Sequence, residues 1–471
     1  MDPFVVIGGD AAGLSAASKL RRDDPDRDGI VFEKGRWVSY AHCGTPYFIK
    51  GEVDRLVDMQ SLSPEEIEER GIDLRREHEA VGVSTDEKTV TVRGPDGEFV
   101  QEYGDLLVAT GARAFVPFEG AELDGVFTLH GLGSAARVRA LLEDPGGFGV
   151  DSLGGGGYTD EKELRRYGNA EPPETVAVVG GGYVGVEMCE AFDTWDVDVH
   201  LFQRSDGVLP EFSEAVAERV EEELEENGVE VHTGTPVERL EGDDGVSRVV
   251  CADGTELGVD AALVGVGVRP NAELVEGEVE TGESGAVAVD RYGRTSAEDV
   301  YAAGDCAETR HVVTGESAWV PLGLTANRAG RAVGATVAGD PTPLGGIAGT
   351  AVLKAFGLEC GRTGIVSGEE ARDAGYEPVV KTVEARSRAG YYPGAARTTI
   401  RLVADRGTER VLGGAIVGED HAAVRIDTVA TAVEAGMTVK EVENLDLGYA
   451  PPFSPVWDPV LVAAKVLNGK L

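Results

Sequence analysis

The chain has 471 residues and a formal net charge of −41, with 84 acidic against 43 basic side chains. This length provides for two or three domains, and an apolar share of 42% is sufficient for buried cores. The acidic residues are spread along the whole chain, which indicates a solvated, halophilic type of surface that disfavours nucleic acid and anionic membranes as partners. We see no signal-peptide pattern and no apolar run long enough to cross a membrane, so we expect a cytoplasmic protein.

The first recognisable unit is a short apolar run, Phe4–Ile7, followed by a glycine turn that contains Gly8 and Gly13. A helix is expected through Leu20, and a second strand ends at Glu33. In such a unit a diphosphate lies on the helix N-terminus and the acid meets a ribose hydroxyl. The middle glycine of the usual GxGxxG pattern is replaced by Asp10, so an ordinary glycine-rich turn remains an alternative for this unit alone.

A second unit of the same kind follows later in the chain. The run Val176–Val179 leads into a complete glycine motif, a helix, and a strand that ends at Phe202. The three motif glycines are Gly180, Gly182 and Gly185. Two such units in one chain indicate dinucleotide binding much more specifically than either does alone.

The ribose position of the second unit holds Gln203, which is followed by Arg204. An acid there would repel the 2′-phosphate of NADPH, whereas glutamine would not, and arginine could bind it. We therefore expect NADPH or NADH to serve, although Arg204 is equally compatible with an ordinary surface residue.

Two strand ends lie outside these motifs. The run Leu106–Ala112 is a strand followed by a turn with Thr110 and Gly111, and Val300–Cys306 is a strand that ends in Gly304 and Asp305. Asp305 could accept hydrogen bonds from ribityl hydroxyls, or it could simply be a turn aspartate. A helix is expected from Ala326 to Val337, with N-terminal amides that could face an electron-rich flavin carbonyl.

The five cysteines are scattered and show no CxxC spacing, which indicates neither a disulfide framework nor a metal site. Four are expected to be packing residues: Cys189, Cys251, Cys306 and Cys360. Cys43 differs because Gly44 and Pro46 indicate a turn or helix start. A thiol beside helix-start amides is partly ionised and nucleophilic, and the alternative is a small buried cysteine that packs like an apolar residue.

The order of these motifs resembles the flavin-dependent pyridine nucleotide–disulfide oxidoreductases over nearly the whole chain. Within them the chain looks most like the single-cysteine branch of coenzyme A-disulfide reductases, NADH oxidases and peroxidases. Its SYAHCGTPY segment around Cys43 is similar to the SYANCGLPY of coenzyme A-disulfide reductases. The YYPG at Tyr391 and the YAPPFS at Tyr449 are similar to that group's YYPG and AYAPPYS.

The resemblance implies an α/β fold with two Rossmann-like domains, for FAD and NAD(P), and a C-terminal α+β dimerisation domain. We expect the FAD-binding domain at 1–143 and 286–344, the NAD(P)-binding domain at 175–285 and the dimerisation domain at 345–471. The latter includes strands Thr398–Val403 and Val411–Val417 and a helix Val424–Ala435. The Gly-rich acidic stretch 144–174, with four glycines from Gly154 to Gly157, is predicted to be a flexible surface insertion rather than a phosphate cradle.

The resemblance also implies a homodimer and a set of cofactor-binding residues, with Tyr183 moving aside to admit the nicotinamide ring. The expected set around FAD is Gly8, Ala11, Ala12, Gly13, Glu33, Lys34, Ser39, His42, Thr110, Gly111, Gly304, Asp305 and Ala326. The expected set around the nicotinamide nucleotide is Gly180, Gly182, Tyr183, Gly185, Glu187, Gln203, Arg204 and Gly267.

Three positions depart from related patterns. A dithiol reductase needs a second cysteine about five residues after the first, and this position is Phe48. The peroxidase histidine of the first glycine loop is replaced by Ala11, which weakens peroxide reduction. His42 stands where asparagine is usual, either as a local cation that tunes the thiolate or as a polar substitute.

The predicted function is reduction of a small thiol disulfide, coenzyme A disulfide first, by NAD(P)H through FAD and a mixed disulfide at Cys43. Tyr449 or Tyr391 of the partner subunit is the expected proton donor, with interface packing as the alternative role for both tyrosines. Two other functions stay open: an NAD(P)H oxidase that reduces dioxygen through a Cys43 sulfenic acid, and a flavoprotein reductase of an electron-carrier protein.

Overall fold

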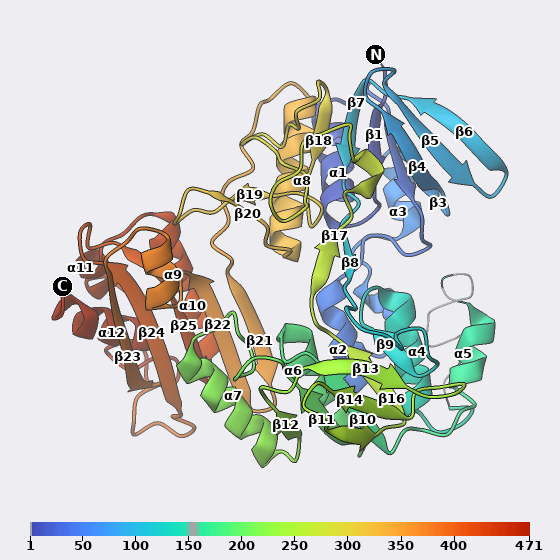
Figure 1. Ribbon diagram of the computed structural model, residues 1–471. Coiled ribbons are helices and arrows are strands. Elements are labelled where there is room, and N and C mark those ends of the chain that lie inside the picture. The colour runs from blue at the N-terminus through green and yellow to red at the C-terminus, as the bar shows by residue number, and fades with distance from the viewer. Residues whose placement is uncertain (1, 148, 150–157, 159) are drawn as a thin grey trace.

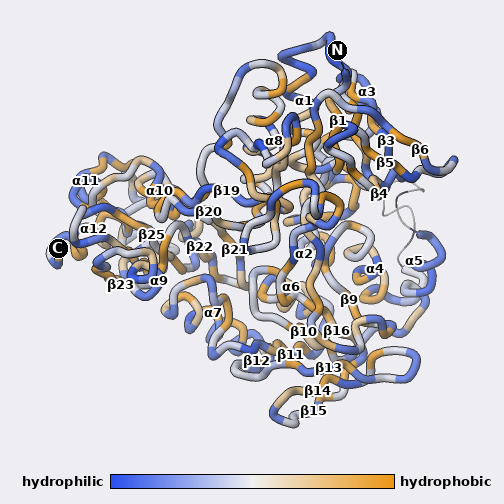
Figure 2. Tube along the Cα trace, turned by 45° about the horizontal axis from the view of Figure 1, so that its top comes forward, coloured by the Kyte–Doolittle hydropathy of each residue, from blue (hydrophilic) through white to orange (hydrophobic). Residues whose placement is uncertain are grey.

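A computed structural model describes residues 2–147, 149, 158 and 160–471 of the protein. Figure 1 shows three regions: one with the N-terminus, one built on the middle of the chain, and one that carries the C-terminus on the opposite side. Hydrophobic segments run through the sheets and the helices against them, whereas hydrophilic segments gather on the outer turns (Figure 2). Among the described residues, no helix is both long and apolar enough to cross a membrane.

The first region is organised on a parallel sheet with the strand order β18-β7-β1-β2-β3. Its strands are β1 (Phe4–Ile7), β2 (Gly29–Glu33), β3 (Ile72–Arg76), β7 (Asp105–Val108) and β18 (Val300–Ala302). An antiparallel sheet lies beside it, formed by β4 (Glu79–Ser84), β5 (Thr89–Gly94) and β6 (Gly97–Glu102). Because β18 comes almost 200 residues after β7, the chain leaves this region and later returns to it.

Two helices on this sheet pack unusually closely. They are α1 (Ala11–Asp23) and α8 (Gly323–Val337). A Cβ atom on Gly330 would lie 2.0 Å from the Ala12 carbonyl oxygen, and one on Gly334 would lie 2.3 Å from the Ala16 oxygen. The small residues therefore let the two backbones approach each other. The connecting segments hold shorter helical elements: η1 (His42–Gly44), α2 (Thr45–Lys50), η2 (Leu56–Met59), α3 (Pro64–Glu69) and η4 (Glu273–Val275). Of these, α2 packs against the second region.

The second region is built on another parallel sheet, with the order β12-β11-β10-β16-β9. Its strands are β9 (Val126–Thr128), β10 (Thr175–Val179), β11 (Asp198–Phe202), β12 (Glu230–His232) and β16 (Ala261–Val264). A three-stranded antiparallel sheet belongs to the same region: β13 (Val237–Glu241), β14 (Arg248–Cys251) and β15 (Glu256–Gly258). Its helices are α4 (Leu132–Leu142), α5 (Glu161–Tyr167), α6 (Tyr183–Asp193) and α7 (Glu214–Glu226).

The structure places the crossings between the two regions earlier than the sequence predicts. β9 pairs with β16 of the second sheet, so the chain has left the first region well before residue 143. Ala272 and Val275 already pack in the core of the first region, before the predicted return at residue 286. The crossing itself is a two-stranded ribbon of β8 (Ala112–Ala114) and β17 (Val268–Pro270).

The predicted Gly-rich insertion is only partly a loop. Its second half forms helix α5, whose Leu164 and Tyr167 are buried against the core of the second region. The Tyr167 hydroxyl donates a hydrogen bond to Asp124 at 2.7 Å, which attaches the helix to the segment before β9. Residues Glu161–Tyr167 are therefore a helix packed on a core rather than part of a surface loop, and Gly154 to Gly157 lie outside the described residues.

The third region is an antiparallel sheet with the order β21-β22-β25-β24-β23, and helices pack on both of its faces (Figure 1). Its strands are β21 (Ala351–Ala355), β22 (Leu358–Gly364), β23 (Pro378–Arg386), β24 (Arg397–Asp405) and β25 (Val411–Gly418). Its helices are α9 (Gly368–Asp373), α10 (Ala422–Glu434), α11 (Val439–Glu443) and α12 (Pro459–Asn468). The small ribbon of β19 (Thr309–Arg310) and β20 (Ser317–Ala318) lies in the connection that leads into it.

Candidate functional site

The first glycine loop is tight because its backbone leaves no room for side chains. Gly8 has a φ of +116°, and a Cβ on it would lie 2.1 Å from the Ala109 carbonyl oxygen. A Cβ on Gly13 would lie 1.9 Å from the Gly8 oxygen. Both positions therefore require glycine, and Ala11 and Ala12 open helix α1 directly behind the loop.

Glu33 holds this loop from the end of β2. Its Oε2 accepts a hydrogen bond from the Gly9 amide at 2.9 Å, and its Oε1 accepts one from the Gly35 amide at 2.6 Å. Lys34 follows directly, and the Ser39 amide donates to the Gly9 carbonyl at 3.1 Å. The carboxylate that is expected to meet a ribose hydroxyl is thus fixed against the phosphate loop.

Asp10, the residue that breaks the glycine motif, connects the loop to the cysteine segment. Its Oδ1 accepts from the Tyr40 amide at 3.0 Å, and its Oδ2 lies 3.0 Å from His42 Nε2. His42 is one residue before Cys43, so its imidazole is held by a carboxylate. The departure from glycine therefore has a structural reason that the sequence motif alone does not reveal.

Cys43 lies in η1, directly before helix α2, and its thiol is exposed. Helix α2 is anchored in the second region, because Phe48 and Ile49 are buried in the same core as Val186 and Met188 of α6. Arg139 Nη1 donates to the Phe48 carbonyl at 2.7 Å, so a carbonyl near the end of α2 has a partner from α4. The cysteine thus stands where the first and second regions meet.

The structure corrects the expected ionisation of the Cys43 thiol. Desolvation by the surrounding protein, the nearby Glu187 carboxylate and Asp305 raise the pKa of Cys43, against a smaller opposing effect of a backbone hydrogen bond. The prediction of a partly ionised thiol considered the helix-start amides and omitted the two acids. These acids come from segments far away in the sequence.

Glu187 of α6 and Tyr47 of α2 form a hydrogen-bonded pair across the junction of the two regions. The Tyr47 hydroxyl donates to Glu187 Oε1 at 3.1 Å. Burial raises the pKa of Glu187 to about 7, although the Tyr47 hydrogen bond acts in the opposite direction. A carboxyl group with this pKa can hold or release a proton near neutral pH.

The second glycine loop repeats the construction of the first. A Cβ on Gly180 would lie 2.5 Å from the Gly265 oxygen, and one on Gly185 would lie 1.8 Å from the Gly180 oxygen. By contrast, a Cβ on Gly182 would meet no atom within 4 Å, so the chain leaves open space above the start of α6. This arrangement fits a diphosphate on the helix N-terminus.

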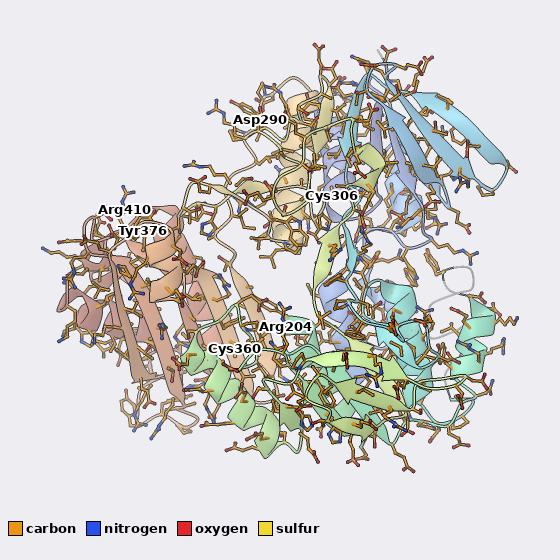
Figure 3. All side chains as sticks on the ribbon, in the orientation of Figure 1. Arg204, Asp290, Cys306, Cys360, Tyr376 and Arg410 are labelled. Carbon is orange, nitrogen blue, oxygen red and sulfur yellow. The ribbon has the colours of Figure 1, made fainter. Side chains whose placement is uncertain are left out.

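Gln203 in the second unit occupies the place that Glu33 has in the first. It is buried, its Oε1 accepts from the Gly181 amide at 3.0 Å, and its Nε2 donates to the Ser205 hydroxyl. Arg204 is exposed on the second region, as Figure 3 shows. The pair therefore presents a neutral amide and an available cation at the end of β11.

Tyr183 stands at the first position of α6 and contacts the third region. Its ring centroid lies 5.4 Å from that of Phe212. Burial raises the pKa of Tyr183 to about 12, and a hydrogen bond with Arg362 of β22 acts against this increase. The side chain expected to move for the nicotinamide ring is thus held between two domains.

Thr110 and Gly111 lie at the crossing between the first two regions. The Thr110 hydroxyl donates to the Asn271 carbonyl at 2.5 Å, and the Asn271 side chain donates back to the Thr110 carbonyl at 2.9 Å. Gly267 has a φ of +112°, and its carbonyl accepts from the Phe115 amide at 3.0 Å. These residues therefore build the connection, with free space next to Gly111 and Gly267.

At the end of β18, Gly304 adopts a φ of +84° and Asp305 follows. Desolvation raises the pKa of Asp305. The helix next to this strand end begins at Gly323, one turn before the predicted start, and the Ala326 amide donates to the Leu322 carbonyl at 3.1 Å. The Ala326 amide is therefore used inside the helix, so the N-terminal amides expected to face a flavin carbonyl belong to the turn that begins at Gly323.

The two candidate tyrosines of the third region come together although 58 positions separate them in the sequence. Both are exposed, and a hydrogen bond with Tyr449 raises the pKa of Tyr391. The neighbouring loop is held by the buried Arg425, which donates to Asp458 at 3.0 Å and to the Phe453 carbonyl at 2.9 Å.

Glu190, which no sequence motif singles out, connects all three regions. Its Oε1 accepts from Lys50 of α2 at 2.6 Å and from Lys354 of β21, and its Oε2 accepts from the Phe356 amide at 2.9 Å. It lies three residues after Glu187, nearly one helical turn, so both acids are on the same side of α6 and only the tertiary structure distinguishes them. The remaining four cysteines are buried, and Figure 3 shows Cys306 and Cys360 in different regions.

Comparisons with known proteins agree with this geometry. A family model described as pyridine nucleotide-disulphide oxidoreductase matches residues 2–330, and a model of that family's dimerisation domain matches residues 350–459. The NAD(P)H coenzyme A polysulfide/persulfide reductase of Pyrococcus horikoshii is 38% identical over 470 residues, 98% of each chain. A protein of Methanocaldococcus jannaschii named NADH oxidase is 32% identical over 99% of each chain.

A solved structure of an NAD-dependent persulfide reductase from A. fulgidus superposes with a TM-score of 0.91 and 35% identity. The match covers 99% of this chain and 83% of that one. The α/β fold class with its C-terminal dimerisation domain, and the enzyme class predicted from the motifs, are thereby confirmed. The chain belongs to the pyridine nucleotide-disulphide oxidoreductase family, whose members use a flavin and a pyridine nucleotide.

Proposed function

We propose that this enzyme reduces a small-molecule disulfide of coenzyme A with NAD(P)H, through Cys43 as the single reacting thiol. The observation that carries the proposal is the environment of Cys43, which is an exposed thiol at the junction of both nucleotide units. Phe48, the place of a second thiol in dithiol reductases, is 1% exposed in the core. Cys43 must therefore exchange with an external sulfur atom.

The residues present fit FAD. Gly8 and Gly13 form a loop without room for a Cβ, and Glu33 is fixed at the adjoining strand end. These residues, with Thr110 and Asp305, would hold the cofactor, and Gly180, Gly182, Gly185 and Gln203 would hold the nicotinamide nucleotide. The chemistry that bound FAD supplies is the relay of an electron pair from the nicotinamide to sulfur.

The sulfur chemistry balances with one thiol on the protein. The Cys43 thiolate attacks one sulfur of coenzyme A disulfide, the S–S bond breaks, and the leaving thiolate takes a proton. Cys43 keeps the other coenzyme A as a mixed disulfide. The hydride from NAD(P)H provides the electron pair and proton that release the second coenzyme A thiol and regenerate the Cys43 thiolate.

Two groups on the chain can handle the protons. Glu187, with a pKa of about 7 and within electrostatic reach of Cys43, can take up the thiol proton when it is ionised. Tyr449, paired with Tyr391, can donate to the leaving thiolate from the partner subunit. This role needs a homodimer, which the dimerisation domain supports.

Exposed apolar side chains in the third region also support the dimer. They gather on the segments around the YYPG and YAPPFS motifs and at the start of α10: Tyr391, Tyr392, Val424, Tyr449, Phe453, Val456 and Trp457. Such a concentration of large apolar side chains is typical of a protein–protein contact. We therefore place the partner subunit against these segments.

Two related reactions share this geometry. The Pyrococcus horikoshii relative is named for coenzyme A polysulfide and persulfide, whose S–S bond a Cys43 thiolate can attack in the same way. The Methanocaldococcus jannaschii relative is named NADH oxidase, and an exposed thiol can also form a sulfenic acid. Coenzyme A polysulfide or persulfide is therefore an alternative substrate for the same reaction. Oxidation of NAD(P)H by dioxygen is an alternative activity.

The test is mass spectrometry of the unreduced protein after incubation with coenzyme A disulfide. We expect the mass of one coenzyme A on the peptide that contains Cys43, and its loss after addition of NADPH or NADH under nitrogen. Buried Cys189 in the same digest serves as the internal control, because it should stay unmodified. A Cys43 peptide that never acquires coenzyme A, with substrate still consumed, would contradict the proposal.

A further inference from the structure

Two histidines and a glutamate meet at the open edge of the second parallel sheet, away from Cys43. Strands β11 and β12 run parallel there, with His200 opposite Glu230 and Phe202 opposite His232 (Figure 1). His200 Nδ1 lies 3.2 Å from His232 Nε2 and 3.3 Å from Glu230 Oε2. The three ligand atoms all lie within 4.8 Å of one another.

We propose that His200, Glu230 and His232 bind one divalent transition-metal ion, zinc foremost. Zinc–nitrogen bonds of about 2.0–2.1 Å in a tetrahedron put neighbouring ligand atoms about 3.3–3.4 Å apart. The separations of 3.2 and 3.3 Å from His200 Nδ1 are close to that edge length. Imidazole suits zinc, copper and nickel, whereas Mg²⁺ and Ca²⁺ prefer sets made only of oxygen ligands.

The rings are held in place before any ion arrives. The Phe202 ring stacks on His232 with centroids 4.6 Å apart and planes 15° apart, and the His200 and His232 rings lie edge to edge with parallel planes, within 9°, and centroids 5.5 Å apart. The His200 side chain is only 12% exposed. Because the backbone ladder and these ring contacts fix both imidazoles, little ordering remains to be done on binding.

The contact between the two rings already requires a free lone pair. Two imidazole nitrogens 3.2 Å apart cannot both carry a hydrogen that points at the other, so at least one of them is a bare acceptor. A neutral nitrogen of this kind is what a transition metal needs as a ligand. Glu230 is 69% exposed, which leaves a path for the ion and space for a water molecule as the fourth ligand.

The site adjoins the nucleotide-binding strand end. The Gln203 amide donates to the His232 carbonyl at 2.9 Å, and the Thr235 amide donates to the Gln203 carbonyl at 2.9 Å. A metal ion would therefore join the three-residue edge strand β12 to β11, near the strand end that Gln203 follows. We assign it a structural role, which is independent of the sulfur chemistry at Cys43.

The test is isothermal titration of the flavin-loaded Cys43→Ser protein with ZnCl₂ in high-salt buffer. This background removes the exposed thiol, which could itself bind zinc. We expect one zinc per chain and no signal with MgCl₂. Glu230→Gln, which changes only an exposed side chain, should weaken zinc binding about tenfold or more, and His232→Gln should abolish it. His78→Gln, which removes an imidazole elsewhere, is the matched control and should bind like the parent.

Thermal denaturation provides a second readout that does not depend on activity. Zinc should raise the Tm of the parent and of His78→Gln, since a ligand of the folded state stabilises it. It should leave the Tm of His232→Gln unchanged. Absence of zinc binding to the parent, or equal binding by the parent, Glu230→Gln and His232→Gln, would overturn the proposal.

Discussion

The Tyr47 hydroxyl donates a hydrogen bond to Glu187 across 3.1 Å, and thereby links the helix after Cys43 to the helix after the second glycine loop. The carboxyl group of this pair has a pKa of about 7 because it is buried. Its charge is one of the causes that raise the pKa of Cys43. The protonation of the acid and the reactivity of the thiol are therefore coupled.

The first prediction concerns this coupling. Ionised Glu187 opposes formation of the Cys43 thiolate, so Glu187→Gln should shift the pH profile of Cys43 alkylation by iodoacetamide to lower pH. Tyr47→Phe removes a hydrogen bond that favours the Glu187 carboxylate. In this variant the pKa of Glu187 should therefore stay above its ordinary value. The other four cysteines are buried, so alkylation of the folded protein reports on Cys43. Identical profiles for the wild type and Glu187→Gln would refute the coupling.

The second prediction concerns the choice of nucleotide. Gln203→Glu keeps the acceptor for the Gly181 amide but adds a negative charge where a 2′-phosphate would lie. We expect kcat/KM for NADPH to fall by a factor equivalent to about 1–3 kcal/mol, with a smaller change for NADH. Arg204→Ala should also disfavour NADPH, through loss of the cation. A wild-type preference for NADH of about a hundredfold would be incompatible with this assignment.

The third prediction concerns Glu190 as the connection between the regions. Glu190→Gln leaves Lys50 and Lys354 without their shared carboxylate and should lower the free energy of unfolding by about 3 kcal/mol. Glu52→Gln, at an exposed partner of the same lysine, should cost well under about 1 kcal/mol. Thermal denaturation of both variants checks this difference.

The pH dependence of the same carboxylate provides an independent check. Burial acts to raise the pKa of Glu190, but its lysine partners prevail and lower it. Its contribution is therefore present above the unfolded-state pKa and is lost as pH falls through the lower folded-state value. The Tm difference between wild type and Glu190→Gln should shrink under acidic conditions. A constant difference would show that its charge does not matter.

The fourth prediction concerns salt. With a net charge of −41, self-repulsion grows as the ionic strength falls and the Debye length increases. We expect the fold or the dimer to be lost below about 0.5 M salt, measured by light scattering and thermal denaturation. Unchanged mass and Tm in dilute buffer would show that the acidic surface is not an adaptation to salt.

The sequence predicts the two nucleotide units well because their signals are local. Strand β1 has its predicted bounds, and the glycines Gly8, Gly13, Gly180 and Gly185 stand at close backbone contacts that no other residue tolerates. Motif spacing records such constraints directly. Helix α8 begins one turn before its predicted start, because neither Leu322 nor Gly323 provides a strong capping signal.

The rest of the site could not be predicted because it depends on contacts between distant segments. Glu187 and Asp305 reverse the expected effect on the Cys43 thiol only after the fold brings them near. Glu190 binds lysines from two other regions, which sequence spacing does not reveal. His200, Glu230 and His232 come together only through the pairing of β11 with β12. Likewise, local signals do not predict that the chain leaves the first region before residue 143, because this depends on the pairing of β9 with a strand more than 130 residues later.

The most direct test of the account is disulfide turnover by Cys43→Ser, followed by the release of coenzyme A thiol under nitrogen. The serine hydroxyl is similar in size to the thiol it replaces, so folding and FAD content should match those of the wild type. The flavin absorption spectrum of the variant is the control for this. Because a serine hydroxyl cannot exchange with a disulfide, we predict that thiol release falls by orders of magnitude. Slow oxidation of NAD(P)H by oxygen in air should persist. Near wild-type release of thiol from coenzyme A disulfide by Cys43→Ser would contradict the central claim that Cys43 carries the sulfur chemistry.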